Sequence, residues 1–575
     1  EVNRNGILLA LGLFTTGWAV QGQPDPKRYW SSPRDGQLSL TATFGEIRNE
    51  HFHSGIDLST GGQEGLEVKA AAEGYISRIK VSPDGFGRVL YITHPNGFVT
   101  VYAHLKRFRE DVQAYTLQNQ KDKKSFSIEL LPKKDQFPVL RGETIALSGN
   151  SGGSRAPHLH FEVRDERTEQ PINPLLFGLQ VEDHVKPEFR ALRVYPLMEN
   201  GIVEGSDSAR SYEIFISDTV YGVGTSEYIK VFGIASVGFD VFDRMEGSDA
   251  ELGIYSAELY VDNMLAYTWT NDRFDFDDTR FVNAHTDYMV KQRDGMCIQR
   301  CQRLSGNNMS LLYPDTGLTG LIDFTGDDSH DLRFIARDFA GNQAEINFQL
   351  QAYSSYANTP YLPHSKQEVR ISWDKGAAIH KEELDVVIPA GAVYQECYYQ
   401  DDAVKSDNYL SPIYLIGDRY EALHTPISIG IKPDKPIADS LKSKALVARL
   451  ELDGKLIASG GTWNKEMLST KVRKFGSYVI TLDTVAPTIT KEYYPADLNT
   501  SRGGIVQFKV ADALSGIQSM ETTIDDQWML AEFDAKDGML TVDLQGLPLN
   551  QLHTVHIVLK DDRNNITDWT DKFWW

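Results

Sequence analysis

Residues 158–164 read HLHFEVR and alternate polar and apolar side chains with the two-residue period of a β-strand. His158 and His160 therefore share one face with the other polar residues, and the three apolar residues share the opposite face. A strand of this kind packs its apolar face on a core and holds two imidazoles on a rigid backbone. This segment predicts a β-sheet that carries a histidine-bearing site.

Two other short strings carry the remaining groups of this site: HFHSGIDL at residues 51–58 and YAHL at residues 102–105. The three strings together supply two imidazoles and a carboxylate for a divalent metal, and two further imidazoles for proton transfer. A lone His-x-His pair is weak evidence, because exposed strands often carry histidines by chance. All three strings in this order, within about the length of one small domain, predict a metal site.

We assign His53, Asp57 and His160 as the metal ligands. Two histidines plus one carboxylate, with a fourth position left to water, is the ligand set of a catalytic zinc site rather than of a closed structural one. Zinc lowers the pKa of its bound water to about 7, which makes hydroxide available at neutral pH. The sequence therefore predicts one Zn²⁺ per chain and a hydrolytic reaction.

The local structure around these strings can also be predicted. The four-residue spacing of His53 and Asp57 would suit one face of a helix, but Gly55 and Ile56 favour a turn that runs into a strand. Residues 89–105 read as two strands joined by a Pro-Asn-Gly turn. His94 beside this turn is interpreted as a hydrogen-bonding group, and His51 as a surface or supporting residue.

These strings resemble the lysostaphin-type or LytM-type zinc metallopeptidases, which cut peptidoglycan cross-bridges. The segments that carry the resemblance lie within about residues 44–164 and read FGEIRNEHFHSGIDL, AAAEGYISRIK, GFGRVLYITHPNGFVTVYAHL, VLRGETIALSGNSG and APHLHFEVR. The resemblance implies a small antiparallel β-sheet domain with an open groove. It matches His53, Asp57 and His160 to the zinc ligands of the family.

By the same resemblance, His104 and His158 match the two catalytic histidines that do not bind the metal. One of them would take the proton of the attacking water, and which one does so is left open. The chain departs from the pattern between His104 and Val139, where a charged segment is longer than a hairpin loop requires. Its first half is predicted to be a helix, and the segment either covers the groove or is a passive surface insertion.

The rest of the chain is expected to be β-rich. At 575 residues it exceeds one core, and beyond about residue 185 short β-branched and aromatic runs alternate with Gly, Asp and Asn turns. An internal echo, GIYSAELYVD at 253–262 and GIQSMETTID at 516–525, supports repeated modules that resemble bacterial immunoglobulin-like domains. The fold class is predicted to be mainly β, a small antiparallel peptidase domain followed by several β-sandwich domains.

The predicted domain boundaries place a signal peptide or N-terminal anchor at 1–22 and the zinc metallopeptidase domain at 23–185. An Ig-like β-sandwich region follows at 186–355, then a β-rich middle module at 356–484 and a C-terminal Ig-like β-sandwich at 485–575. The last boundary lies at DTVAPTI, which reads as a linker. The β-rich modules are interpreted as scaffold or as cell-wall-binding modules, with no site residue assigned in them.

Composition and charge limit the class of binding partner and the cellular compartment of the protein. The formal net charge of −22 argues against nucleic-acid binding. The apolar run at residues 7–20 has the length of a signal-peptide core, so export is expected, to the periplasm or cell envelope rather than to the medium. Any membrane contact is expected through this segment alone. Three cysteines are too few for a disulfide framework, although Cys297 and Cys301 are predicted to pair.

These observations predict an exported zinc metalloendopeptidase that hydrolyses the peptide cross-links of peptidoglycan. Two alternatives stay open at this point. The first is a catalytically inactive protein that regulates another wall hydrolase, and such a protein would be expected to lack one of the ligands. The second is a cell-wall binding or adhesion protein in which the peptidase-like domain is incidental.

Overall fold

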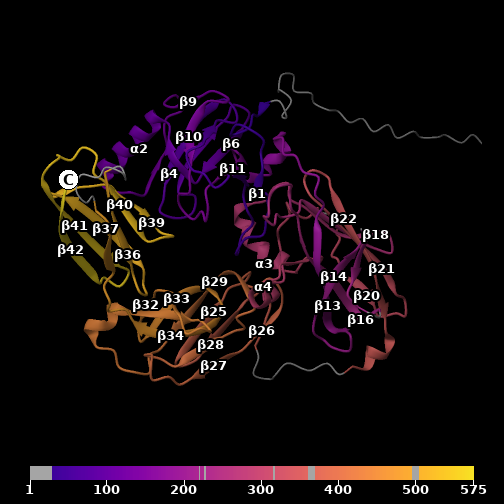
Figure 1. Ribbon diagram of the computed structural model, residues 1–575. Helices are drawn as coiled ribbons and strands as arrows, with labels where there is room; N and C mark the ends of the chain where they lie inside the picture. The colour runs from indigo at the N-terminus through magenta and orange to yellow at the C-terminus, as the bar shows by residue number, and fades with distance from the viewer. Residues whose placement is uncertain (1–28, 219, 226–227, 315–316, 360–368, 495–503) are drawn as a thin grey trace, which may run out of the picture.

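The computed structural model describes residues 29–218, 220–225, 228–314, 317–359, 369–494 and 504–575. The chain is mainly β, as predicted, and its strands pair within four groups along the sequence. We call these groups the N-terminal unit (β1–β12), the second unit (β13–β22), the third unit (β23–β34) and the C-terminal unit (β35–β42). Figure 1 shows the four units arranged as a ring in which the first and the last lie next to each other.

The N-terminal unit is built on a nine-stranded sheet with the order β1-β2-β11-β6-β5-β4-β8, where β12 pairs with β11 and β9 with β4; β3, β10 and β7 form a second, three-stranded sheet. Its elements are β1 (Leu40–Ala42), β2 (Ile56–Ser59), β3 (Glu67–Lys69), β4 (Gly74–Val81), β5 (Arg88–Thr93), β6 (Phe98–Ala103), β7 (Leu105–Phe108), α2 (Glu110–Lys123), β8 (Ile128–Leu130), β9 (Pro138–Val139), β10 (Thr144–Ser148), β11 (His158–Asp165), β12 (Pro171–Ile172) and η1 (Pro174–Phe177).

The predicted local structure of this unit is confirmed. β5 and β6 form the antiparallel hairpin, and the turn between them contains Pro95, Asn96 and Gly97. Gly97 has a φ of +82°, which a residue with a Cβ rarely adopts. The central strand β11 buries its three apolar residues, Leu159, Phe161 and Val163, in the core. The opposite polar face of β11 is thereby left to the candidate site.

The charged segment after His104 forms β7, the predicted helix α2, and β8. Val112 on α2 is fully buried, and Tyr115 packs edge-to-face on Phe137 with ring centroids 5.4 Å apart. β8 pairs with β4 at the edge of the sheet, so β4, β5 and β6 separate it from β11. The insertion therefore extends the sheet on the side away from β2 and β11.

The second unit has a ten-stranded sheet with the order β18-β17-β21-β22-β15-β14-β13-β16-β19, and β20 pairs with β16. β22 also pairs with β16, so β22, β15, β14, β13 and β16 form a closed cycle of strands. The elements are β13 (Glu188–Val203), β14 (Arg210–Ser217), β15 (Val220–Val223), β16 (Ile229–Phe242), β17 (Ser256–Val261), β18 (Met264–Thr270), η2 (Phe276–Phe281), α3 (Val282–His285), α4 (Tyr288–Asp294), β19 (Ile298–Arg300), β20 (Ile322–Phe324), β21 (His330–Arg337), β22 (Gln343–Ala352) and η3 (Ser354–Asn358).

The third unit encloses its own core between two five-stranded antiparallel sheets, β24-β25-β29-β33-β32 and β27-β28-β34-β30-β31, beside a β23-β26 pair. Its elements are β23 (Val369–Ile371), β24 (Ala377–His380), β25 (Leu384–Ile388), β26 (Cys397–Tyr399), β27 (Asp401–Val404), β28 (Ile413–Ile416), β29 (Ala422–Ile431), η4 (Asp439–Lys444), β30 (Ala445–Leu450), β31 (Leu456–Ala458), β32 (Thr462–Asn464), β33 (Met467–Lys474) and β34 (Gly476–Leu482).

The C-terminal unit packs two four-stranded antiparallel sheets, β35-β36-β40-β39 and β38-β37-β41-β42, around a third separate core. Its elements are β35 (Thr488–Tyr493), β36 (Ile505–Ala511), β37 (Ile517–Ile524), β38 (Gln527–Trp528), β39 (Ala531–Asp534), β40 (Met539–Asp543), β41 (Leu552–Asp561) and β42 (Ile566–Trp574).

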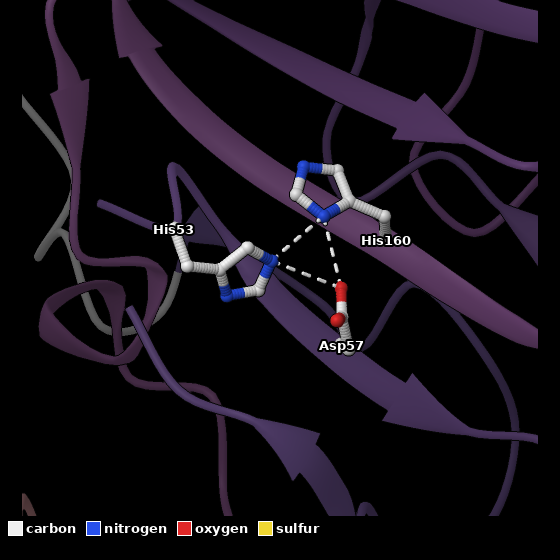
Figure 2. A group of neighbouring side chains, drawn as sticks. All are labelled: His53, Asp57 and His160. Carbon is white, nitrogen blue, oxygen red and sulfur yellow. Dashed lines mark hydrogen bonds and ion pairs between the residues drawn. The ribbon is translucent and has the colours of Figure 1, made fainter. Parts of the chain in front are cut away.

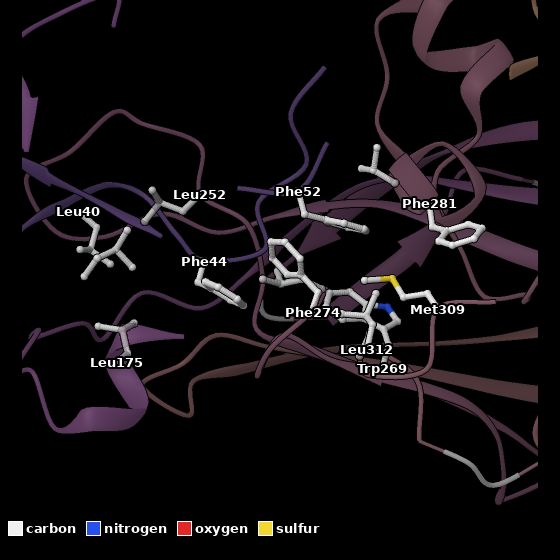
Figure 3. Packing of buried hydrophobic residues seen from close by; sticks show 14 of the residues in the cluster. Leu40, Phe44, Phe52, Leu175, Leu252, Trp269, Phe274, Phe281, Met309 and Leu312 are labelled. Atoms are coloured by element: carbon white, nitrogen blue, oxygen red, sulfur yellow. The ribbon is translucent and has the colours of Figure 1, made fainter. Parts of the chain in front are cut away.

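The N-terminal and second units share one continuous hydrophobic core. Phe44 and Phe52 of the N-terminal unit pack on Phe274, with ring centroids 5.2 and 5.8 Å away. Figure 3 shows these rings together with Leu40 and Leu252, which belong to the same cluster. Burial of apolar surface contributes roughly 25 cal/mol per Å² to the free energy of folding. The packing against the second unit therefore stabilises the N-terminal segment that carries the candidate site.

The predicted disulfide between Cys297 and Cys301 is wrong, because all three cysteines are free thiols. The two residues flank β19, and an extended strand advances about 3.3 Å per residue. Their Cα atoms are therefore too far apart for a disulfide, which needs about 4.4–6.8 Å.

The predicted signal peptide or anchor at residues 1–22 lies outside the described residues. None of the helices in the described part of the chain has the length and apolar character that a membrane crossing needs.

Candidate metal centre

The register of two neighbouring strands brings Asp57 and His160 side by side. β2 and β11 are antiparallel, and Asp57 of β2 lies directly opposite His160 of β11. His53 precedes β2 and reaches the same point through the turn at Gly55. A Cβ on Gly55 would lie 2.4 Å from the carbonyl oxygen of Phe161, so only glycine allows this close approach of the turn to β11.

The three predicted ligands meet at their donor atoms (Figure 2). His53 Nε2 lies 3.0 Å from His160 Nδ1 and 3.1 Å from Asp57 Oδ1, and His160 Nδ1 lies 2.9 Å from Asp57 Oδ1. Donor atoms that share a tetrahedral zinc ion at about 2.0–2.1 Å lie about 3.3 Å from one another. All three side chains are buried, and the residue types and the spacing both fit a zinc ion.

Contacts outside the triangle fix which ring nitrogen faces it. His53 Nδ1 lies 2.7 Å from the carbonyl oxygen of Thr43, and His160 Nε2 lies 2.9 Å from Glu162 Oε1. Carbonyl and carboxylate oxygens only accept, so these ring nitrogens donate, and in the neutral form of each ring the opposite nitrogen keeps its lone pair. Such outer partners orient metal-binding histidines and raise their basicity.

Glu162 contacts the candidate ligand His160 and was not assigned from the sequence. It is fully buried and accepts hydrogen bonds from Ser54 and Arg164 as well as from His160. Burial alone would raise its pKa, but Arg164 and His160 outweigh this effect and lower the pKa to about 2. Its place on the same strand face as His160 was the available signal.

Arg48 and Glu46 also border the site and were not assigned from the sequence. Arg48 Nη2 lies 3.2 Å from Asp57 Oδ2 and 3.2 Å from Glu46 Oε1. Arg48 thus holds one carboxylate oxygen of Asp57 while the other oxygen faces the triangle. Burial would raise the pKa of Asp57, yet His53 and hydrogen bonds from His158 and His160 hold it well below its ordinary value.

His104 and His158 lie next to the triangle, with their ring centroids 4.8 Å apart. His104 Nδ1 donates to the carbonyl oxygen of Ser151 at 2.9 Å, and His158 Nδ1 donates to that of Ala156 at 2.8 Å. The Nε2 atom of a neutral His104 therefore keeps its lone pair, whereas His158 Nε2 lies 3.4 Å from Asp57 Oδ1, toward which it can donate. Both rings lie at the edge of the candidate site.

The electrostatics separate His104 from His160. Burial first, and then His160 and His158, lower the pKa of His104 to about 3, so its imidazole is neutral at physiological pH. Burial would also lower the pKa of His160, but hydrogen bonds with Asp57 and Glu162 raise it to about 9. A metal ion at the triangle would therefore have to replace a proton on His160.

Phe86 completes the surroundings from the loop between β4 and β5. Its ring stacks on His160 with centroids 5.1 Å apart and meets the edge of His104 at 6.4 Å. Among the other histidines, His94 is a buried hydrogen-bonding group, as predicted, with its ring nitrogens 2.7 Å from Glu73 O and Thr100 Oγ1. His51 is exposed and bonds to Asn49 O.

Two segments of the chain match known protein families. Residues 51–121 match Peptidase family M23, and residues 368–483 match the Zu5-like domain. The first match covers the candidate ligands His53 and Asp57 and the candidate proton acceptor His104. The second covers the whole of the third unit, from β23 to β34.

Two curated relatives match part of this chain. The DD-carboxypeptidase/endopeptidase Mpg of Neisseria meningitidis serogroup B is 33% identical over 128 residues, which are 22% of this chain and 23% of the relative. The murein hydrolase activator NlpD of Salmonella typhimurium is 26% identical over 152 residues, which are 26% of this chain and 32% of the relative. The chain thus matches less than a third of the length of either protein.

The catalytic domain of the antimicrobial peptidase lysostaphin from Staphylococcus simulans is a similar solved structure. It is 22% identical, aligns with 24% of this chain and 92% of that domain, and gives a TM-score of 0.19.

Proposed function

We propose that this chain, which carries a peptidase family M23 domain of the lysostaphin and LytM type, is a zinc metalloendopeptidase that hydrolyses the peptide cross-links of peptidoglycan. The observation that carries the proposal is the triangle of donor atoms from His53, Asp57 and His160, whose ring tautomers are fixed by Thr43 and Glu162. Two further histidines, His104 and His158, stand beside it.

His53 Nε2, Asp57 Oδ1 and His160 Nδ1 would hold the metal. When bound, zinc supplies a Lewis acid that activates water and stabilises negative charge on the peptide carbonyl oxygen. The chain's own residues then move the protons. One of the Nε2 atoms of His104 and His158 accepts the proton of the attacking water, and an imidazolium formed in this way returns a proton to the departing amine. The other imidazole, when it carries a proton on its Nε2 atom, helps to stabilise the oxyanion.

Arg48 and Phe86 support this chemistry without taking protons. Arg48 fixes the orientation of the Asp57 carboxylate, and Phe86 covers one face of His160. Covering the ring excludes water from that side of the site, which strengthens the electrostatic interactions within it.

The substrate is proposed from the relatives and from the chain's composition. One relative is named as an endopeptidase and another as a murein hydrolase activator. An exported, acidic chain suggests the periplasm or envelope of a Gram-negative cell, where the cross-link would be D-alanine to diaminopimelate. Polyglycine bridges and proteins outside the wall are the competing substrates, and defined muropeptides distinguish among them.

A catalytically inactive activator of another wall hydrolase is the second candidate, because one relative carries that name. In this chain all three candidate ligands and both candidate proton acceptors are present and lie together. This observation favours the enzyme over the regulator. A cell-wall binding or adhesion role for the β-rich units is compatible with either candidate.

The test is incubation of the purified chain with defined cross-linked muropeptides, with and without a chelator. We expect cleavage that the chelator abolishes and stoichiometric zinc restores. His184 has a side chain that is 80% exposed, far from the triangle in sequence, and His184→Ala is the matched histidine control that should keep full activity. Cleavage that persists unchanged in excess chelator would contradict the zinc mechanism. Failure to cleave with zinc bound would favour the activator.

A further inference from the structure

The second and C-terminal units contain matching clusters of three aspartates. Within each cluster, one carboxylate oxygen of each aspartate lies within 4.8 Å of the corresponding oxygens of the other two. The clusters are Asp183, Asp243 and Asp338, and Asp483, Asp512 and Asp561. Neither cluster shares a residue with the candidate zinc site, and neither contains a histidine or cysteine.

The two clusters are built from the same three sequence elements. Asp183 and Asp483 open the strings DHVKP and DTVAP, which lead into β13 and β35. Asp243 and Asp512 directly follow β16 and β36, and each is followed four residues later by glycine. Asp338 and Asp561 open DFAGN and DDRNN, the turns before β22 and β42.

An asparagine orients the first and third aspartates in the same way in both units. Asn342 Nδ2 donates to Asp338 Oδ2 at 2.7 Å and to the carbonyl oxygen of Asp183 at 3.1 Å. Asn565 Nδ2 donates to Asp561 Oδ2 at 2.7 Å and to the carbonyl oxygen of Asp483 at 2.9 Å. The two clusters, which lie in separate parts of the chain, therefore have the same arrangement of hydrogen bonds.

The middle aspartate of each cluster has a buried carboxylate oxygen that is available to a ligand. Asp243 is only 2% exposed, and its Oδ1 atom has no hydrogen-bond partner among the described residues. The buried Oδ2 atom of Asp512 likewise has no partner within the described part of the chain. A buried carboxylate oxygen without a partner lowers the stability of the folded state. Among the described residues, none of the six aspartates forms an ion pair.

The charges within the first cluster lead to the same conclusion. Burial first, then Asp338 and Asp183, raise the pKa of Asp243 to about 8. Burial is also the largest cause that raises the pKa of Asp183, to about 6. Three carboxylates gathered in this way repel one another, and a cation among them would relieve the repulsion.

We propose that each aspartate cluster binds one Ca²⁺ ion. Hard cations take oxygen ligands alone, whereas zinc sites include nitrogen or sulfur donors, which these clusters lack. Three carboxylates with neighbouring carbonyls and water can supply the six to eight oxygens that Ca²⁺ prefers. Each ion would tie the segment that enters a unit to two of that unit's turns. Calcium would therefore stiffen the junctions at residues 183–187 and 483–487.

The test is equilibrium dialysis of the full zinc-loaded chain against radioactive Ca²⁺ at about 1 mM, within the range of calcium modules outside the cytosol. We expect two calcium ions per chain. Asp243→Asn and Asp512→Asn should each lower the number to one, and the double variant should bind none. His160→Ala should still bind two, which separates these sites from the zinc site and from the proposed peptidase function.

Asp262 and Asp525 provide matched controls. They occupy equivalent positions in the same two units, outside the clusters, and pair with His330 and His553. Asp262→Asn and Asp525→Asn should keep both calcium ions. Equal calcium loss in Asp262→Asn and Asp243→Asn, or no calcium bound by the unaltered chain, would overturn the proposal. Full displacement of Ca²⁺ by an equal concentration of Mg²⁺ would overturn the calcium assignment.

Thermal unfolding distinguishes an aspartate that binds calcium from one that only supports the fold. Calcium should raise the unfolding midpoint of the unaltered chain, and the rise should be smaller in Asp243→Asn. In calcium-free buffer Asp243→Asn should unfold at the same or a higher temperature than the unaltered chain, because the substitution removes a repelled carboxylate. A variant destabilised equally with and without calcium would contradict the proposal.

Discussion

At the scale of single residues, the site depends on the contacts behind the ligands as much as on the ligands themselves. Glu162 accepts from His160 and is in turn held by Ser54 and Arg164. Thr43 plays the corresponding part for His53 through its carbonyl oxygen. Each ring therefore turns its other nitrogen toward the triangle, and His160 gives up the proton on that nitrogen when a metal binds.

Glu162→Gln should weaken zinc binding by about 10- to 100-fold, the usual effect of losing such an outer partner. The amide lacks the negative charge that makes His160 more basic. Competition against a zinc chelator of known affinity measures the change. Glu129→Gln is the matched control, because Glu129 forms an equivalent ion pair with Arg78 at the far edge of the same sheet. Zinc affinity equal to that of the unaltered chain would refute the assigned role of Glu162.

Gly55→Ala should displace His53 or β2 from β11, because the new Cβ would meet the carbonyl oxygen of Phe161 at 2.4 Å. We expect a loss of about 1–3 kcal/mol in the free energy of unfolding together with loss of bound zinc. Denaturant titration and elemental analysis measure the two effects. Gly153→Ala, where the nearest heavy atom to the added Cβ is 3.4 Å away, is the control. Unchanged zinc content in Gly55→Ala would show that the close approach is not required.

The sequence allowed the five histidine and aspartate positions to be predicted, because each lies in a short string of fixed spacing. It did not reveal Arg48 or Phe86 as part of the site. Arg48 reaches Asp57 across a turn, and Phe86 reaches His160 from a loop about 75 residues earlier in the chain, so neither contact follows from local periodicity.

At the scale of secondary-structure elements, the strand pairings explain why the site is rigid. β11 lies between β2 and β6, so His160 and its partners stand on a strand that is hydrogen-bonded on both sides. The hairpin β5–β6 was predictable from its Pro-Asn-Gly turn, and α2 from the length and composition of its segment. The path of the insertion along the β4 edge was not predictable, because it depends on packing against distant strands.

Val112→Ala tests the interpretation of the insertion as an edge extension. Val112 is fully buried, and its truncation should cost about 1–2 kcal/mol in unfolding free energy. Zinc content and the rate of muropeptide cleavage should not change, because β4, β5 and β6 separate β8 from β11. Exposed Gln118→Ala on the same helix is the control and should stay within about 0.5 kcal/mol. A large fall in cleavage with stability preserved would indicate a groove-lining role instead.

At the scale of the whole molecule, contacts between the C-terminal and N-terminal units close the ring of four units. Glu532 of β39 forms an ion pair of 2.5 Å with Arg88, and Lys536 donates to the carbonyl oxygens of Asn150 and Gly152. Arg88 opens β5 two residues after Phe86, which touches His160, and Asn150 and Gly152 flank Ser151, which touches His104. Figure 1 shows the C-terminal unit beside the N-terminal unit. The internal repeat was visible in the sequence, but this closure between the ends of the chain was not.

Glu532→Arg should open the ring, because it places two positive charges opposite each other at the junction. An exposed ion pair contributes only about 0–1 kcal/mol, so stability should barely change while the largest dimension measured by small-angle X-ray scattering increases. Glu521→Arg, on an exposed position of β37 in the same unit, is the control that should leave the dimension unaltered. Identical scattering from both variants would show that the contact does not hold the ring closed.

The most direct test of the zinc peptidase account is elemental analysis of two purified variants, followed by assay on the same muropeptide. His160→Ala should contain no zinc and cleave nothing. His104→Ala should retain one zinc per chain and still fail to cleave, because only a proton acceptor has been removed. Loss of zinc from both variants to the same extent, or full cleavage by His160→Ala, would contradict the account.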